Sequence, residues 1–183
     1  MSVASTISKF SFFILALSLG LFIAGCSPSH MVKKDARPDI TAVNPIPGKS
    51  ALVIARTTSF GGAIEFDTFL DRQMIGVTKG KSYFIKKDIE PGPHYLSSRA
   101  ENLTSIILNF EPDKTYYYQH EVRMGIWRAR VEMVPESPGH IKSEMSDSCT
   151  YYEYDVKDPG QDLSDEEYKD HVEKGNNVKD AHK

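Results

Sequence analysis

Residues 116–124 read YYYQHEVRM, and two kinds of side chain alternate along all nine positions. Every second residue is mostly aromatic or apolar: Tyr116, Tyr118, His120, Val122 and Met124. The residues between them are mostly polar: Tyr117, Gln119, Glu121 and Arg123. A period of two is typical of a β-strand with one buried and one wet face. Gly125 ends the pattern, which resumes over 127–133, so the stretch predicts a β-hairpin in an antiparallel sheet.

The same alternation recurs upstream in short runs separated by turn residues. β-forming runs occupy 51–57, 63–71, 74–77, 83–89, 94–100 and 105–110. The alternation puts Phe69 on the polar face of its run, and it puts Phe84 and Ile89 on opposite faces of theirs. Turn sequences stand between the runs, such as Asp71-Arg72-Gln73 and Glu90-Pro91-Gly92. In the second, Pro presets φ and Gly accepts a positive φ. With the hairpin this makes about eight strands in residues 51–135, at a spacing typical of an antiparallel sandwich or barrel. We therefore predict an all-β fold, an antiparallel β-sandwich of about 7–8 strands that needs no internal helix.

The regions on either side of this domain lack the pattern. Residues 26–50 contain Pro and scattered charges but few large apolar residues, so we expect a flexible tether. Residues 136–156 are expected to form a loop that could end in an edge strand over 150–156. In the acidic tail, 157–183, a capping-box pattern begins at Ser164. A short helix could follow over 165–174, and we expect the rest of the tail to be disordered.

The first 25 residues have the layout of a secretory signal helix. Lys9 supplies a positive charge, and residues 10–24 are uncharged and rich in Phe, Leu and Ile. This apolar run is shorter than the roughly 20 residues that span a bilayer. We predict a cleaved signal peptide over residues 1–25, with an uncleaved membrane anchor as the alternative.

The end of this segment, Ile23-Ala24-Gly25-Cys26, resembles the lipobox of bacterial lipoproteins. The resemblance implies cleavage between Gly25 and Cys26, a diacylglyceryl group on the Cys26 sulfur, and a further acyl chain such as palmitate on the new amine. Two or more acyl chains anchor a protein stably, because each buried methylene contributes about 0.8 kcal/mol. By the sorting tendency of this class, Ser27 after the cysteine implies an outer-membrane protein that faces the periplasm.

Lipidation of Cys26 would leave Cys149 without an intramolecular partner, because the chain has two cysteines. An odd cysteine in an exported protein indicates an intermolecular disulfide or a thiol that stays reduced. A partly buried thiol with no role is the other interpretation, and the sequence leaves both open.

Charge and residue spacing weigh against several function classes. The formal net charge is −3, and residues 155–183 alone contribute −4, from nine Asp and Glu against five Lys. No basic patch therefore favours nucleic-acid binding. The six His show no metal-ligand spacing, and there is no nucleophile motif or Gly-rich phosphate loop. We expect no catalytic residue, no metal and no cofactor besides the covalent lipid on Cys26, and therefore no enzyme.

Aromatic and basic side chains around the predicted hairpin form the binding surface that the pattern suggests: Tyr117, Arg123, Arg128 and Arg130. The arginines could contact an anion or a glycan, or they could form cross-strand ion pairs with neighbouring Glu residues. Tyr117 could stack on a sugar, although β-propensity also accounts for it. His120 falls on the apolar side, so we expect a core histidine bonded to a Tyr or to the backbone.

Residues 51–135 resemble a bacterial domain family of unknown function, DUF2846, whose members are often small lipoproteins. The resemblance rests on the order of several short features: a first strand ending in Arg56, FLDRQMIG at 69–76, Tyr83-Phe84 before Glu90-Pro91-Gly92, KTYY at 114–117, and Arg123-Met124-Gly125. The Pro-Gly turn followed by a strand is also similar to PEGA and carboxypeptidase-regulatory-like sandwiches. The resemblance implies a fold and a location but no activity.

These observations predict a lipid-anchored envelope protein that acts as a structural or binding module. Its partner would be another envelope protein or a cell-wall polymer. The alternatives are an envelope glycan-processing enzyme and a surface-exposed adhesion or interaction module. The enzyme would require a pocket that holds His120 with an Asp or Glu within hydrogen-bond reach.

Overall fold

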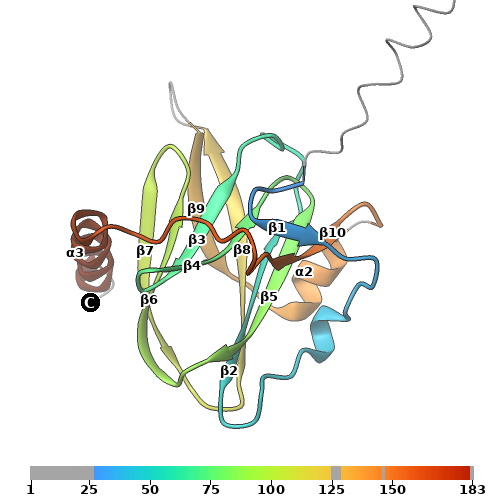
Figure 1. Cartoon of the computed structure of the whole chain (residues 1–183), viewed down its shortest axis with the longest axis horizontal. Helices are drawn as coiled ribbons and strands as arrows, with labels where there is room; N and C mark the ends of the chain where they lie inside the picture. The colour runs from blue at the N-terminus through green and yellow to red at the C-terminus, as the bar shows by residue number, and fades with distance from the viewer. Residues whose placement is uncertain (1–26, 125–128, 146, 182–183) are drawn as a thin grey trace, which may run out of the picture.

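The computed structural model describes residues 27–124, 129–145 and 147–181. The predicted signal peptide, its cleavage site at Gly25 and Cys26, and Arg128 lie outside the described residues. The described chain forms two β-sheets that pack on one another (Figure 1).

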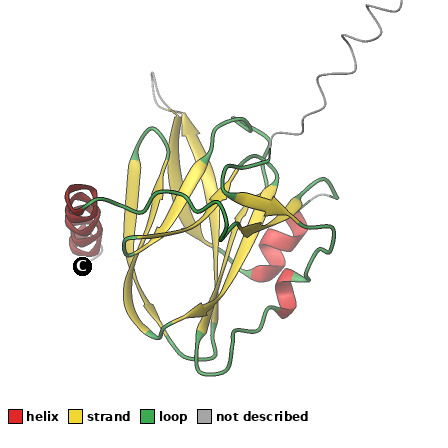
Figure 2. Ribbon diagram, in the orientation of Figure 1, coloured by secondary structure: helices red, strands yellow, loops and turns green. Residues whose placement is uncertain are grey.

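Six strands form sheet A, in the spatial order β1 (Met31–Lys33), β10 (Thr150–Tyr154), β5 (Ser82–Ile89), β2 (Ser50–Arg56), β8 (Thr115–Met124) and β9 (Ala129–Pro135). Four strands form sheet B, in the order β4 (Gln73–Thr78), β3 (Phe66–Leu70), β6 (Gly92–Arg99) and β7 (Leu103–Phe110). The predicted all-β sandwich is confirmed, and the eight strands β2 to β9 lie where the alternation placed them. Figure 2 shows the strands between helical segments on opposite sides of the molecule.

Sheet A departs from the predicted antiparallel pattern at two places. β2 pairs in parallel with β8, and β10 pairs in parallel with β5, whereas the other neighbouring strands are antiparallel. The reason lies in β2, which is buried along its whole length. Strands that are covered on both faces read as continuous apolar runs, and parallel pairing is common among them. The apolar run over 51–55 is such a sequence.

Inward-facing side chains of the two sheets fill the interior, largely on the faces that the alternation predicted. Tyr118 and His120 of β8 are buried, as are the inward residues of β3. β5 differs, because a register shift against β2 brings both Phe84 and Ile89 into the core, although the pattern put them on opposite faces. Gly76 lies under the Phe84 ring, where a Cβ would come within 2.7 Å of the ring.

The segment before β2 is not the flexible tether that its composition predicts. β1 pairs with β10, and the short helix η1 (Ile40–Ala42) buries Ile40 against the outer face of sheet A. A helix that was not predicted, α2 (Pro138–Glu144), buries Ile141 in the same cluster and is capped by the Ser137 side chain. The prediction of a free tether is wrong because a few apolar side chains, Ile40 and Val43 among them, cover the second apolar face of β2.

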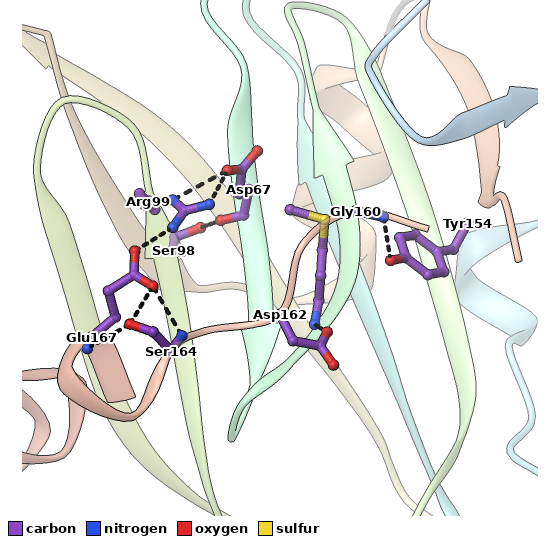
Figure 3. Close-up of polar contacts among 9 residues, drawn as sticks. Asp67, Ser98, Arg99, Tyr154, Gly160, Asp162, Ser164 and Glu167 are labelled. Carbon is purple, nitrogen blue, oxygen red and sulfur yellow. Dashed lines mark hydrogen bonds and ion pairs between the residues drawn. The ribbon is translucent and has the colours of Figure 1, made fainter. Parts of the chain in front are cut away.

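The acidic tail is also ordered, against the prediction of a mostly disordered segment. Residues 155–164, the C-terminal strap, cross the outer face of sheet B and lead into α3 (Asp165–Ala181). Figure 3 shows the polar contacts that hold the strap: Asp162 accepts a hydrogen bond from the Met74 backbone, and Glu167 contacts Arg99. Leu163 is buried in the core cluster, so the strap contributes apolar contacts as well.

Helix α3 is longer than the helix predicted over 165–174, and it packs on β7 and β6. Its His171 is buried with its ring 5.9 Å from that of Phe69, a residue of β3 that the alternation placed on the wet face. The capping box is present, since the Ser164 and Glu167 side chains bond each other and each other's backbone N–H. Within the part of the chain that the structure describes, no helix is long and apolar enough to cross a bilayer.

Strand directions define two ends of the sandwich. At the first, the Ser27 end, β2 and β8 finish and β3 and β5 begin. Lys79 donates to the Ser27 carbonyl there, at 3.3 Å, and the Ser29 backbone N–H donates to Glu65 Oε1 at 2.8 Å. The opposite end, the far end, contains the β3–β4 and β5–β6 turns. The two ends are separated by the length of β5, about 26 Å at 3.3 Å per residue.

Candidate functional site

An open groove of about 780 Å³ lies at the far end, between the β3–β4 turn, the β5–β6 turn and α3. We call it the far groove and define it by six of its lining residues: Asp71, Arg72, Glu90, His94, Tyr95 and Tyr168. Its volume is in the range of small-molecule and ligand-binding clefts. Its lining combines aromatic rings with charged groups of both signs.

Asp71 organises the floor of the far groove from the tip of the β3–β4 hairpin. Leu70 pairs with Gln73, so Asp71 and Arg72 form a two-residue turn, and Asp71 has φ of 54°. Two-residue hairpin turns need such a positive φ, and Asp tolerates it better than most residues. The Asp71 carboxylate accepts the Tyr95 backbone N–H at 3.0 Å and contacts His94 Nδ1 at 2.7 Å.

His94 ties the two turns of the far groove together. Its Nδ1 faces the Asp71 carboxylate, and its Nε2 lies 2.9 Å from the Glu90 carbonyl oxygen. Both ring nitrogens therefore lie within hydrogen-bond distance of oxygen atoms. The ring also packs edge-on against Phe110, with centroids 5.7 Å apart. His94 therefore links the β3–β4 turn to the β5–β6 turn. Both of its ring nitrogens are occupied by these contacts, so neither is positioned to accept a proton from a ligand.

Two tyrosines and an arginine form the wall of the far groove. The rings of Tyr95 and Tyr168 meet edge to face at 6.2 Å, so the wall depends on α3 being docked. The Arg72 guanidinium lies 5.9 Å from the Tyr168 ring and pairs with Asp165 at 2.5 Å. Burial, and then the Asp71 charge, raises the pKa of Tyr168, so its hydroxyl stays protonated at neutral pH. The wall can stack on and hydrogen-bond a polar ligand.

The interior at the Ser27 end is polar, in contrast to the exposed charges of the far groove. Arg56, at the end of β2, is 0 % exposed, and it donates to the carbonyl oxygens of Phe60, Gly61 and Ile64 at 2.7–2.8 Å. Its guanidinium lies 4.1 Å from the centroid of the Phe66 ring. Burial lowers the pKa of Arg56 to about 10, which leaves the group charged at neutral pH. Through these hydrogen bonds, Arg56 fixes the conformation of the loop over residues 57–65.

His120 is confirmed as a core histidine, but its partners differ from those predicted. The ring bonds to the hydroxyls of Thr78 at 2.8 Å and Ser98 at 2.6 Å, rather than to a Tyr or to the backbone. Burial, and secondarily the charge of Arg56, lowers the pKa of His120 to about 3, so the ring is neutral at physiological pH. Both ring nitrogens therefore bond hydroxyl groups rather than carboxylates.

A second hollow of about 490 Å³ lies beside the Ser27 end, where β8 approaches α2. The Gln119 amide donates to Glu144 at 2.8 Å and to Thr57 at 3.2 Å, and Thr57 donates to the same carboxylate. The Gln119 hydrogen bond lowers the pKa of Glu144, ahead of the opposing effect of burial. These contacts hold α2 against sheet A, and we interpret the hollow as a gap between these packed elements.

The residues proposed from the hairpin pattern do not form one surface. Tyr117 is half-buried beneath η1, and its hydroxyl donates to the Ile40 carbonyl at 2.9 Å. It is therefore not available to stack on a sugar, which corrects that prediction. Arg123 forms a cross-strand ion pair with Glu132 of β9 and a second ion pair with Glu121 of its own strand. Arg130 is exposed opposite Arg123, and Arg128 lies outside the described residues.

The far groove was not predicted, because its parts come from distant stretches of sequence. The turn at Asp71 and the turn before His94 are both visible in the pattern, yet nothing in the sequence brings them together. Tyr168 falls in the short helix that the sequence allows over 165–174, in a tail otherwise expected to be disordered. The capping box before it was the one available signal that an ordered helix could supply a wall.

Two further expectations concern metal binding and Cys149. Among the described residues, no group of three or more His, Cys, Asp or Glu could hold a metal ion. Cys149 is buried, at 2 % exposed, just before β10. An intermolecular disulfide would therefore need this part of sheet A to open first.

Comparison with known proteins adds a relative but no activity. A protein of Haemophilus influenzae described as uncharacterized is 29 % identical over 127 residues, which cover 67 % of this chain and 75 % of that protein. No family model and no solved structure matches the chain.

Proposed function

We propose that this protein is a lipid-anchored module of the bacterial envelope that binds a cell-wall polymer through the far groove. The observation that carries the proposal is the position of the groove, at the end of the sandwich opposite Ser27. With a lipid on Cys26, the groove would point away from the bilayer. A DUF2846-like lipoprotein of the outer membrane, facing the periplasm, would then present it to the wall.

The chemistry of the far groove supports a polymer of sugars and short peptides as the ligand. The rings of Tyr95 and Tyr168 offer apolar faces on which a sugar can stack. Arg72, Lys86 and Asp88 at the rim can pair with the charged groups of peptide stems. An open groove of this size can accept one segment of a longer polymer.

Co-sedimentation with purified wall sacculi tests the groove. Arg72→Ala removes the cation beside Tyr168, and we expect the dissociation constant for sacculi to rise about 10-fold, from the loss of one charge-assisted contact. Arg123→Ala is the matched control, since it removes an arginine with two carboxylate partners from the other end. Its binding should stay close to that of the unchanged protein.

Equal loss for both arginine variants would mean that binding is general electrostatics and would contradict the groove assignment. Binding unaffected by Arg72→Ala and Tyr168→Ala would contradict it too. If sacculi do not bind at all but site-specific crosslinkers in the groove capture a defined envelope protein, the ligand class is wrong and a protein partner replaces it.

The lipid anchor has its own test. Cys26→Ala should leave an unprocessed precursor that carries no lipid label in cells fed radiolabelled palmitate. A processed and labelled product from this variant would contradict the anchor.

A further inference from the structure

We infer that the Ser27 end of the sandwich lies directly against the bilayer, with Phe60 inserted at the membrane interface as a second attachment beside the lipid on Cys26. This inference rests on the proposed lipid anchor. It goes further by fixing the orientation of the domain and by assigning a membrane-contacting residue.

The chain is fixed to the domain from its first described residues onward. The Ser29 backbone and hydroxyl both donate to Glu65, and the Lys79 ammonium contacts both Glu65 and the Ser27 carbonyl. Just downstream, the His30 carbonyl accepts a hydrogen bond from the Asp155 backbone at 2.8 Å. Figure 1 shows this blue start of the described chain next to the loop that follows β2.

Little chain therefore separates the acylated residue from the folded domain. Cys26 immediately precedes Ser27, and one residue of extended chain reaches about 3.6 Å. The tether expected over 26–50 would have let the domain turn freely at a distance from the membrane. The ordered segment would instead hold the Ser27 end within a few ångströms of a lipid on Cys26.

The loop over 57–65, at the same end, is held as a rigid platform. Buried Arg56 bonds three of its carbonyl oxygens, including that of Phe60. Gly62 and Gly80 pack backbone to backbone, and a Cβ on Gly80 would lie 2.7 Å from the Gly62 Cα. The Gly80 N–H donates to the Gly62 carbonyl at 3.1 Å. The loop cannot fold back over its own aromatic residue without breaking these contacts.

Phe60 is the large apolar side chain that this platform exposes, at 55 % of its surface. An exposed aromatic ring at the same end of the domain as an acylated residue would gain by entering the interface between head groups and acyl chains. Exposure alone does not single it out, because Ile46 is 50 % exposed as well. Ile46 lies in the loop before β2, at the far end, and so provides a matched control.

The test places a benzophenone-bearing amino acid at position 60 or position 46 of the full-length protein in cells. After illumination, mass spectrometry measures phospholipid adducts and, separately, acylation of Cys26. We expect about 10-fold more lipid adduct from position 60 than from position 46, since an interfacial side chain lies about 5–10 Å deep, whereas position 46 would be held about 26 Å from it.

Each outcome decides a different claim. An acylated protein with equal or absent adducts at position 60 overturns the orientation and leaves the lipid anchor standing. A protein without acylation at Cys26 overturns the anchor and the orientation together. Phe60→Ser supplies a second measurement, because it should release the acylated protein from vesicles more readily than Ile46→Ser does. Equal release by both variants would contradict a role for Phe60.

Discussion

The two ends of the sandwich solve the burial of polar groups in opposite ways. At the Ser27 end, Arg56 and His120 lie inside, each bonded to uncharged oxygens. At the far end the interior is closed by apolar side chains such as Phe110 and Ile89, and Asp71 and His94 stay at the surface. A buried ionisable group is costly unless it is hydrogen-bonded. The structure around Arg56 and His120 at the Ser27 end must therefore stay in place to keep these groups bonded. The charged residues of the far end lie at the surface, so replacing them should cost less stability.

The largest expected effect comes from removing the buried cation at the Ser27 end. Arg56→Met keeps an apolar stem of similar length but leaves the carbonyls of Phe60, Gly61 and Ile64 without their donor. We expect the free energy of unfolding, measured by urea titration, to fall by about 3–5 kcal/mol.

Arg72→Met is the matched change at the far end. Its ion pair with Asp165 is largely exposed, so the cost should stay below about 1 kcal/mol. Similar losses for the two variants would remove the distinction between the ends.

The next effect concerns the strap that covers sheet B and supplies one wall of the far groove. Deleting residues 160–183 exposes the site of Leu163 and removes Tyr168, so we expect a loss of about 3 kcal/mol and a melting temperature lower by many degrees. Thermal unfolding followed by circular dichroism measures it. Deleting only 175–183 should have little effect, and an unchanged melting temperature for the longer deletion would mean that the strap is not packed in solution.

Acid should destabilise the Ser27 end through His120. Its folded pKa, about 3, lies below the unfolded value of 6.5, so the stability it contributes is complete above pH 6.5 and is lost as pH falls toward 3. Between about pH 7.5 and about pH 5 the free energy of unfolding should fall by about 2 kcal/mol from this group alone. Urea titrations at both pH values measure it.

His120→Gln is the control for the acid effect. The variant is less stable, but the part of the pH dependence that belongs to His120 should disappear. A pH dependence identical to that of the unchanged protein would show that His120 does not hold its low pKa in solution.

Apart from the control change at Arg72, the smallest expected loss of stability is at the Asp71 turn of the far end. Asp71→Ala forces an alanine into a positive φ and removes the bonds to Tyr95 and His94, for a loss of about 1–2 kcal/mol. Asp71→Asn keeps an acceptor for the Tyr95 N–H and tolerates the backbone, so its loss should be smaller. Equal losses in urea titrations of the two variants would contradict the turn geometry.

Much of the fold was predictable because it depends on local period and turn chemistry. Alternation over 116–124 placed Tyr118 and His120 inside, and the turns at Asp71 and Gly92 stand where the strands reverse. The bulge in β5 was not predictable, since only pairing with β2 brings Ile89 to the same side as Phe84. The far groove was missed for the same reason, because its two turns and α3 meet only in three dimensions.

By itself the sequence determined the all-β class and the positions of the eight central strands, and it led to the expectation that Cys26 is lipidated. These follow from neighbouring residues alone. The tertiary structure decided which segments cover the two sheets, and therefore whether the segments before β2 and after β10 are ordered. Ile40 and Leu163 are single apolar residues in polar segments, too few to give a periodic signal, yet each finds an apolar sheet face that is already formed. Such long-range burial orders a segment whose own composition predicts disorder.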